Sequence, residues 1–396
     1  REWACEGFYR VPFFIESTEF AIHANSDCEN ILNLRSREYF HNFEWQFLCL
    51  SFLAHVFPTD GLFVNTRFEK PLPLPMVMGE IILIAVNGDD IASVNQANYL
   101  LKKGIWIPLD DVEGHAAYRC EHVRLWFLPE QILSEDHLDK RWAAATNEHV
   151  NEVIFPSRHA AKSGTPCLTL HPIGVPHLSH DDIPEFGGRS GYAPPPSTRL
   201  GPWWRLLKAK WTTDQIPDFS LSLEVTHHGP VLDVPCLFIE VGSTQDYWGH
   251  EGAAELLADV IWEGLGLTGG VQHGRWDSKK HHSQPVLITL GGGHYAPKGN
   301  KLASEDGVWL GHMLANHSIP FGSSEDPGVL WRQSIDAIVQ STQKAFPNGS
   351  VIATVEKKSF KGWQRQLIYQ HLEFLSVPVM RSKPFLEMVK SRQQNQ

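Results

Sequence analysis

Short apolar runs that stop abruptly at polar residues recur through the middle of the chain. The run at 221–225 (LSLEV) is followed by His227 and His228, and the run Cys236–Val241 contains Glu240 near its end. Apolar runs of this length, bounded by Gly and Pro turns, predict buried strands. An ionisable side chain at the end of a buried strand is costly unless it has a partner. We therefore predict that these imidazoles and this carboxylate pair with one another or bind a ligand.

Three further predicted strands end in histidine. His159, His171 and His294 follow the apolar runs VIF, CLTL and VLITL. The carboxyl ends of parallel strands lie along one edge of an α/β sheet, where ligands bind. Residues that are far apart in the sequence are thus predicted to meet at one polar site.

In the rest of the chain, segments whose apolar residues have the spacing of a helix alternate with further apolar runs. Helices are predicted at 91–101, 136–146, 203–211, 252–265, 304–316, 329–346 and 361–375, and further strands at 80–86, 123–128 and 351–355. Strands that alternate with helices indicate an α/β fold with a mostly parallel sheet flanked by helices.

The first 78 residues differ from the remainder. They contain one predicted helix, Glu44–Val56, and close in the proline-rich stretch Lys70–Pro75, which is typical of an extended linker. We expect an N-terminal extension with a Pro-rich linker at 1–78 and a catalytic domain at 79–396.

Composition and charge limit the binding partners and the cellular compartment that we expect for this protein. The formal net charge is −11, so a nucleic acid would have to meet a local basic patch. The six cysteines lie far apart and form no CxxC pair, which favours a reducing, cytoplasmic setting. No apolar run reaches the roughly 18–20 residues of a membrane span.

A mixed set of histidines and a carboxylate with open coordination positions suits zinc, whose bound water ionises near neutral pH. We predict one or two zinc ions, held by some of His159, His171, His227, His228, Glu240 and His294. The spacing alone does not establish a metal, because no compact ligand motif is present. Glu240 is open to three roles: a ligand, a general base, or a cap of the turn at 242–244.

Other predicted site residues surround this set. Glu240, His228 and Thr226 form the predicted catalytic group, and either the metal or the amides of Gly291, Gly292 and Gly293 are predicted to stabilise an oxyanion. Ser243 and Tyr295 are predicted to contact substrate. The predicted RNA contacts combine basic and aromatic residues near the C-terminus, namely Lys357, Lys358, Lys361, Trp363 and Arg365.

Several blocks of this sequence resemble the archaeal and plant type of D-aminoacyl-tRNA deacylase. The matching blocks are FPSRHAAKSGTPCLTLHPIGV, GGRSGYAPPPSTRLGPW, LEVTHHGP, FIEVGSTQDYWG, GGGHYAP, WLGH and KSFKGWQ. The resemblance covers residues from about 79 to about 380 and is nearer to the plant branch. It implies zinc-dependent hydrolysis of the ester between a D-amino acid and the 3′-terminal ribose of tRNA. It also implies a fold similar to those of peptidyl-tRNA hydrolase and the nucleoside phosphorylases.

Two other functions fit the same residues. One is a metal-independent hydrolase or phosphorylase of this fold, acting on peptidyl-tRNA or a nucleoside. The other is a tRNA-binding protein without catalysis, although simple RNA binding does not need histidine and glutamate at strand ends. The sequence leaves open whether the protein is a monomer or a homodimer.

Overall fold

The computed structural model describes residues 80–129, 131–212 and 216–394. These residues belong to one compact unit, Met78–Gln396. The extension predicted at 1–78 and the helix predicted at Glu44–Val56 lie outside the described residues and stay predictions.

A mostly parallel sheet of eight strands organises this unit, in the order β2-β3-β4-β1-β5-β8-β6-β7. Its strands are β1 (Ile81–Asn87), β2 (Ile107–Pro108), β3 (Ala117–Cys120), β4 (Val123–Leu128), β5 (Val150–Arg158), β6 (Cys167–His171), β7 (Ser220–Leu223) and β8 (Cys236–Gly242). The pairs β4/β1, β1/β5, β5/β8 and β6/β7 are parallel. The predicted fold class, an α/β protein with a mostly parallel sheet, is confirmed.

Helices cover both faces of this sheet because its central strands are apolar throughout. In β1, Ile82 and Ile84 belong to the core beneath α2 (Ile91–Lys103), α4 (Leu200–Lys210) and α6 (Glu251–Gly264). Leu83 packs on the opposite face, against the core that includes Trp142 of α3 (Leu138–Thr146).

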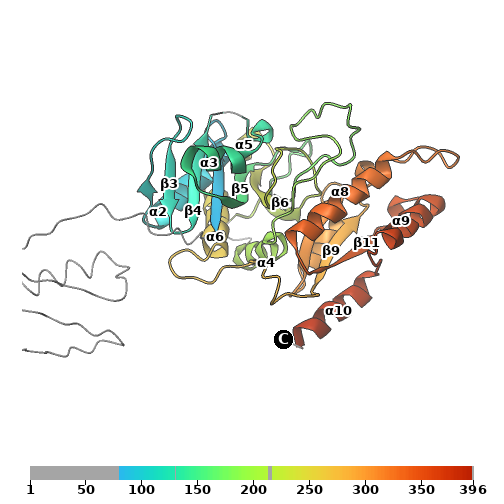
Figure 1. Ribbon diagram of the computed structural model, residues 1–396. Coiled ribbons are helices and arrows are strands. Elements are labelled where there is room, and N and C mark those ends of the chain that lie inside the picture. Colours follow the sequence, from blue (N-terminus) through green and yellow to red (C-terminus); the bar gives the residue numbers. More distant parts are fainter. Residues whose placement is uncertain (1–79, 130, 213–215, 395–396) are drawn as a thin grey trace, which may run out of the picture. The chain divides into compact units, whose positions relative to one another are not determined.

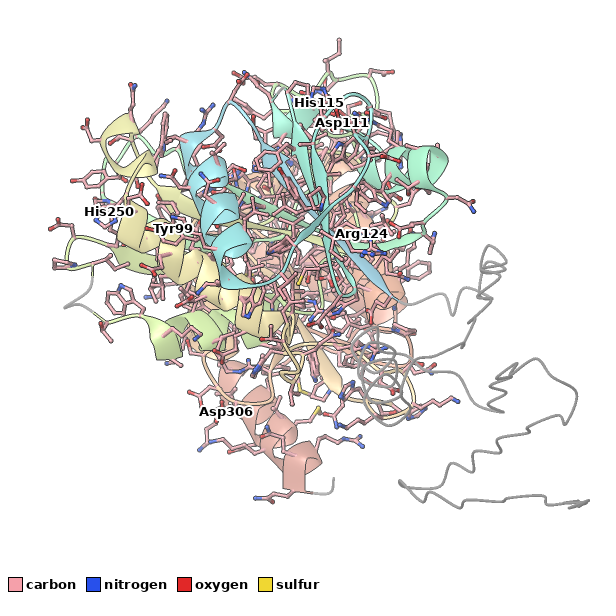
Figure 2. The ribbon with its side chains drawn as sticks, turned by 90° about the vertical axis from the view of Figure 1, so that its left-hand side faces the viewer. Tyr99, Asp111, His115, Arg124, His250 and Asp306 are labelled. Carbon is pink, nitrogen blue, oxygen red and sulfur yellow. The ribbon has the colours of Figure 1, made fainter. Side chains whose placement is uncertain are left out.

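The two helices α2 and α6 lie side by side (Figure 2). Tyr99 of α2 donates from its hydroxyl to Glu251 in the first turn of α6, at 2.8 Å. His250 precedes α6 and caps it, since its Nδ1 accepts from the amide of Ala253. The short helix α5 (Gln245–Trp248) links β8 to α6.

A second sheet of three parallel strands follows in the C-terminal part of the unit. It has the order β10-β9-β11, with β9 (Pro285–Leu290), β10 (Trp309–Leu314) and β11 (Ser350–Val355). Helix α8 (Leu330–Ala345) lies against this sheet, and α9 and α10 stand near β11 (Figure 1). The remaining helices are α7 (Pro297–Ala303), α9 (Gly362–Phe374), α10 (Ser382–Gln394), η1 (Ile132–Ser134), η2 (Asn316–Ser318) and η3 (Lys357–Ser359).

Two expectations are corrected. The helix predicted at 304–316 is wrong, because this segment contains strand β10, in which Gly311 fits closely against Thr342 of α8. The five polar strand ends also do not lie along one edge of a single sheet. Strand β6 runs antiparallel to β8, and β9 belongs to the smaller sheet.

Among the described residues, none of the helices is both long enough and apolar enough to span a bilayer.

Candidate metal centre

Three histidines converge where the two sheets meet, and the backbone fixes each ring. Nδ1 of His227 donates to the carbonyl oxygen of Val225 at 2.7 Å. Nδ1 of His228 and Nδ1 of His171 donate to the carbonyl oxygen of the following residue, at 2.7 Å and 3.2 Å. A carbonyl oxygen only accepts hydrogen bonds, so each Nδ1 carries the ring hydrogen. Each neutral ring therefore keeps its lone pair on Nε2.

Rings held in this way have the form that metal-binding histidines take. A ligating imidazole almost always donates its second nitrogen to a carbonyl or carboxylate, which fixes the tautomer. The three rings offer nitrogens that all lie within 4.8 Å of one another. Nε2 of His171 is buried and has no hydrogen-bond partner among the described residues. These residues therefore fit a metal ion, and we call His171, His227 and His228 the histidine triad.

Two buried carboxylates border the histidine triad. Glu240 is 4% exposed, and its Oε1 lies 3.5 Å from Nε2 of His171. Its Oε2 accepts a hydrogen bond from Thr169 at 3.2 Å and lies 3.3 Å from Nδ1 of His159. Glu240 therefore lies beside two of the predicted imidazoles, and its closest contact, the Thr169 hydroxyl, comes from the antiparallel neighbour β6.

Glu224 was not singled out by the sequence, yet it connects more of the predicted residues than any other carboxylate described. It is 1% exposed, and its Oε2 accepts a hydrogen bond from Nε2 of His294 at 2.7 Å. Oε1 lies 2.9 Å from Nδ1 of His159, and Oε2 lies 3.6 Å from Nε2 of His227. Two further groups could thus hold a cation: Glu224 with His227 and His294, and Glu224 with His159 and Glu240.

The electrostatics keep both carboxylates ionised. Burial opposes the charge on Glu224, but the imidazoles of His159 and His294 outweigh it and hold the pKa of Glu224 well below its usual range. Burial likewise opposes the charge on Glu240, and His171 and His159 lower its pKa to about 2. Two negative charges in a buried site favour a cation.

The histidines divide into two kinds, and His171 belongs with His159: burial disfavours its charge, but Glu240 and Glu224 raise its pKa. Burial and the neighbouring imidazoles lower the pKa of His228 to about 4 and that of His227 well below its usual range. Both rings are therefore neutral near pH 7 and can serve as ligands. Burial also disfavours a charge on His159, but Glu224 and Glu240 raise its pKa to about 11.

The turn that carries His227 and His228 is held by contacts between the sheets. After β7, the amide of Val225 donates to the carbonyl of His294 at 2.9 Å, and the amide of Thr226 donates to that of Met313 in β10 at 2.7 Å. His228 then has φ 44°, in the left-handed region that non-glycine residues rarely adopt. Such strained backbone clusters at functional sites.

Thr226, predicted to be catalytic, and Ser243, predicted to contact substrate, both form hydrogen bonds within the protein. Thr226 is fully buried, and its hydroxyl pairs with Nδ1 of His312 at 2.9 Å. Ser243 is also buried and donates to the carbonyl oxygens of Gly242 and Thr165. Neither hydroxyl is accessible to a substrate, so both residues stabilise the loops around the site instead.

The glycine loop after β9 is also partly engaged. The amide of Gly291 donates to the carbonyl of Leu314 at 2.8 Å, and the amide of Gly292 donates to Ser359 Oγ at 2.8 Å. Only the exposed Gly293 has an amide that donates to no acceptor among the described residues. Tyr295 does reach the site, since its hydroxyl lies 3.2 Å from Nε2 of His159.

The predicted RNA-binding segment lies next to this glycine loop. A Cβ added to Gly291 would lie 2.6 Å from Phe360 and 2.9 Å from Ser359, so the loop and the KSFKGWQ segment pack tightly. Lys357, Lys358 and Lys361 are exposed there.

The other two residues of that prediction have contacts within the protein. Arg365 donates to the carbonyl oxygens of Lys357 and Phe360, and Trp363 packs on Phe321. Of the five residues, the three lysines therefore offer free charge, and the remaining two shape the segment.

The fold and the site together describe an α/β protein with a buried site of histidines and glutamates that could hold a metal ion. Comparison with known proteins narrows the class. The family description "D-aminoacyl-tRNA deacylase" matches residues 146–380. The D-aminoacyl-tRNA deacylase of Arabidopsis thaliana is 41% identical over 322 residues, which is 77% of this chain and 99% of that protein.

More distant relatives agree with this match. The D-aminoacyl-tRNA deacylase of Pyrococcus furiosus is 31% identical over 212 residues, covering 52% of this chain and 70% of that protein. The crystal structure of a conserved protein of unknown function has the same fold, with a TM-score of 0.62 over 78% of this chain and 97% of that one, at 23% identity. The chain belongs to the D-aminoacyl-tRNA deacylase family and is thereby an enzyme, a hydrolase that acts on ester bonds.

Proposed function

We propose that this protein hydrolyses the ester bond of D-aminoacyl-tRNA and releases free tRNA and the D-amino acid. A zinc ion in the site and a cytoplasmic setting are part of the proposal. The observation that carries it is the histidine triad, whose ring nitrogens lie within 4.8 Å of one another beside two ionised carboxylates.

The histidine triad would hold the metal, with Glu240 or Glu224 as a further ligand. A bound zinc ion supplies a water of low pKa and polarises a carbonyl oxygen. The imidazoles suit zinc better than magnesium or calcium, which prefer oxygen ligands. The group of Glu224, His227 and His294 is an alternative place for the ion, because Nε2 of His227 can bind only one metal.

Glu240 would act as the general base. Its Oε1 is 3.5 Å from Nε2 of His171, so a water held near the triad lies within reach of this oxygen. The hydroxyl of Thr169 and the ring of His159 fix the other oxygen, Oε2, and thereby orient the carboxylate. Glu240 would take the proton of the attacking water as the water adds to the ester carbonyl.

Tyr295 and Gly293 would contact the substrate. Since the pKa of His159 is raised to about 11, the ring is protonated and donates from Nε2 to the Tyr295 oxygen. Tyr295 would donate a hydrogen bond to the ribose oxygen as the C–O bond of the ester breaks, and the proton that Glu240 took from the water would pass to that oxygen. The amide of Gly293 is the one left in the glycine loop to stabilise the oxyanion.

The tRNA would be held through its phosphates. Lys357, Lys358 and Lys361 lie in η3 and at the start of α9, and the Gly292–Ser359 hydrogen bond joins this segment to the glycine loop. A helix N-terminus adds backbone amides and a favourable dipole for phosphate. The D form would be selected because the side chain of the L form has no room in the site.

The test is a matched assay on D-Tyr-tRNA and L-Tyr-tRNA with wild type and Glu240→Gln. We expect wild type to release tyrosine from the D form only. Glu240→Gln should bind tRNA as wild type does and lose at least about 100-fold in kcat, the lower range for a general base. Equal hydrolysis of both forms would contradict the proposed substrate, and full activity of Glu240→Gln would remove this carboxylate from the mechanism.

A further inference from the structure

A basic and aromatic groove lies beside the metal centre, on elements that the proposed chemistry does not use. It has a volume of about 720 Å³ and is lined by residues of α4, β7 and α7, among them Trp204, Lys208, Trp211 and Lys301. Trp204, Lys208 and Trp211 are spaced by four and three residues, which places them on one face of α4 and its C-cap. We call this the α4–α7 groove.

The chemistry of the groove suits a nucleotide strand. Trp204 is nearly buried and forms part of the wall, donating from Nε1 to Ser304 at 3.0 Å, whereas Trp211 is half-buried. Lys208 and Lys301 are exposed, and neither forms a salt bridge within the part of the chain that the structure describes. None of the nine described lining residues is acidic, although the chain as a whole carries a net charge of −11. Lys208 does donate to Ser304 at 2.9 Å, but neither lysine has an acidic partner among the described residues. Aromatic rings beside such lysines bind single-stranded bases and phosphates.

Two walls of the groove, formed by β7 and α7, are close along the chain to residues of the candidate metal centre. Leu221 in the groove lies three residues before Glu224 in the chain, a separation of about 10 Å at the rise of a strand. Pro297 in the groove lies three residues after His294. Asn300 ties the two walls together, since its Oδ1 accepts from the amide of Leu223 at 2.7 Å and its Nδ2 donates to Tyr295 O at 2.6 Å. A substrate held at the centre therefore has this groove as its neighbour.

We propose that the α4–α7 groove binds the unpaired nucleotides that precede the terminal adenosine of tRNA, with a base against Trp211 and phosphates near Lys208 and Lys301. This inference rests on the proposed function, because it assigns a place to the RNA part of that substrate. Of the two parts joined by the ester, only the RNA strand extends beyond the centre. The lysines of η3 and α9 would then hold RNA on the other side of the glycine loop.

The test compares a full and a minimal substrate. D-Tyr-tRNA carries the preceding nucleotides, whereas the D-tyrosyl ester of adenosine lacks them. The variants are Trp211→Ala, Trp211→Phe and the double variant Lys208→Ala/Lys301→Ala. The control is Lys103→Ala/Lys210→Ala, which causes the same change in net charge but removes lysines that are paired with Asp259 and Glu263.

We expect Trp211→Ala to raise KM for D-Tyr-tRNA by about 5- to 100-fold, the range for loss of one stacked base. Trp211→Phe should recover most of this loss. The double lysine variant should raise KM and should lower the salt dependence of tRNA binding by about 0.7 in slope for each lysine. All variants should hydrolyse the adenosine ester at the wild-type rate, and the control should match wild type on both substrates.

Three other results would count against the inference. Wild-type kinetics of Trp211→Ala and of the double variant on D-Tyr-tRNA would show that the groove holds no part of the RNA. An equal loss on both substrates would show a structural effect on the centre instead. If wild type hydrolysed neither ester, the proposed function itself would fail, whatever the groove binds.

Discussion

Glu224 shows how much of the site depends on a single buried charge. It sits among His159, His227 and His294, three histidines that arrive from different strands. With only 1% of its surface exposed, its charge is stabilised by these imidazoles rather than by water. Glu224 therefore sets both the orientation of His294 and the protonation of His159.

We expect Glu224→Gln to lower kcat/KM on D-Tyr-tRNA by about 10- to 100-fold, the usual effect of losing a residue that orients metal ligands. The amide removes the charge that raises the pKa of His159, and one of its two groups cannot accept from His294. Glu263→Gln is the matched control, because Glu263 pairs with Lys210 away from the centre. Steady-state kinetics and melting curves of both variants check the prediction, and unchanged kinetics of Glu224→Gln would refute it.

Glu224 could have been predicted from the sequence. The rule that a charge in a buried strand needs a partner identified Glu240, and it applies equally to the glutamate within LSLEV. Thr226 and Ser243 could not be placed in this way, because the direction of a hydroxyl depends on neighbours from other segments. Their partners, His312 and the Thr165 carbonyl, lie 86 and 78 residues away.

At the scale of elements, close contacts between helices determine which positions can accept a larger side chain. The α6 helix has two glycines with opposite surroundings. A Cβ on Gly264 would lie 2.4 Å from the ring of the buried Trp203 on α4, whereas one on Gly252 would meet its nearest described atoms at 3.4 Å. The α4–α6 contact lies behind the wall of the α4–α7 groove, so its packing also supports that surface.

Gly264→Ala should destabilise the protein by about 1–3 kcal/mol, because the added methyl group overpacks the α4–α6 contact. Gly252→Ala in the same helix should be neutral or stabilise it by up to about 1 kcal/mol, because alanine favours the helix. Urea unfolding of the two variants measures both values. Equal stabilities would contradict the close α4–α6 packing.

A second contact between elements predicts a pH dependence. Arg124 of β4 binds Glu148, the residue between α3 and β5, through both Nε and Nη2. Burial would raise the pKa of Glu148, but Arg124 outweighs it and lowers that pKa. A carboxyl with a lowered pKa in the folded state stabilises the protein above its unfolded pKa, and this contribution is lost as pH falls through the folded value.

Glu148→Gln should therefore cost about 1–3 kcal/mol of unfolding free energy at neutral pH, since it leaves the buried Arg124 without its charged partner. The difference from wild type should shrink once pH falls below the ordinary glutamate pKa of about 4.3. Urea unfolding across this pH range tests the sign. A difference that grows toward low pH would contradict it.

Elements were predictable where local pattern and final packing agreed. Strands β1, β5, β8 and β9 followed from apolar runs, and α8 followed from helical spacing. Strand β10 was mistaken for a helix because the spacing of its apolar residues fits both periods, and only its pairing with β9 decides between them. The split into two sheets likewise depends on pairing between distant segments, which a single sequence does not display.

At the scale of the unit Met78–Gln396, the candidate metal centre lies where two sheets meet, and both sheets contribute to one core cluster, for example Ile82 of β1 and Leu287 of β9. Backbone hydrogen bonds from Val225 and Thr226 cross from the end of β7 to the loop after β9 and to β10. His312 adds a side-chain link, since it pairs with Thr226 and donates from Nε2 to Pro194 O at 3.0 Å. An ion bound by residues of both parts would tighten this junction.

Metal removal should therefore lower thermal stability. Binding to the folded state alone stabilises it by about 2.7 kcal/mol when the ligand is present at 100 times its Kd. With an unfolding entropy of about 2.1 cal/mol/K per residue, this corresponds to roughly 4 °C in Tm for the unit Met78–Gln396. We expect wild type to lose this increment on chelation and to regain it with zinc. Variant His171→Ala should show little response to either treatment.

The most direct test of the central claim is a zinc titration of metal-free protein, with bound zinc and the hydrolysis rate of D-Tyr-tRNA measured on the same samples. We predict that activity is absent without metal and returns in proportion to bound zinc in wild type. In His227→Ala and His228→Ala, both zinc binding and activity should fail to return. Full hydrolysis by metal-free wild type would contradict the metal centre and favour a metal-independent hydrolase of the same fold.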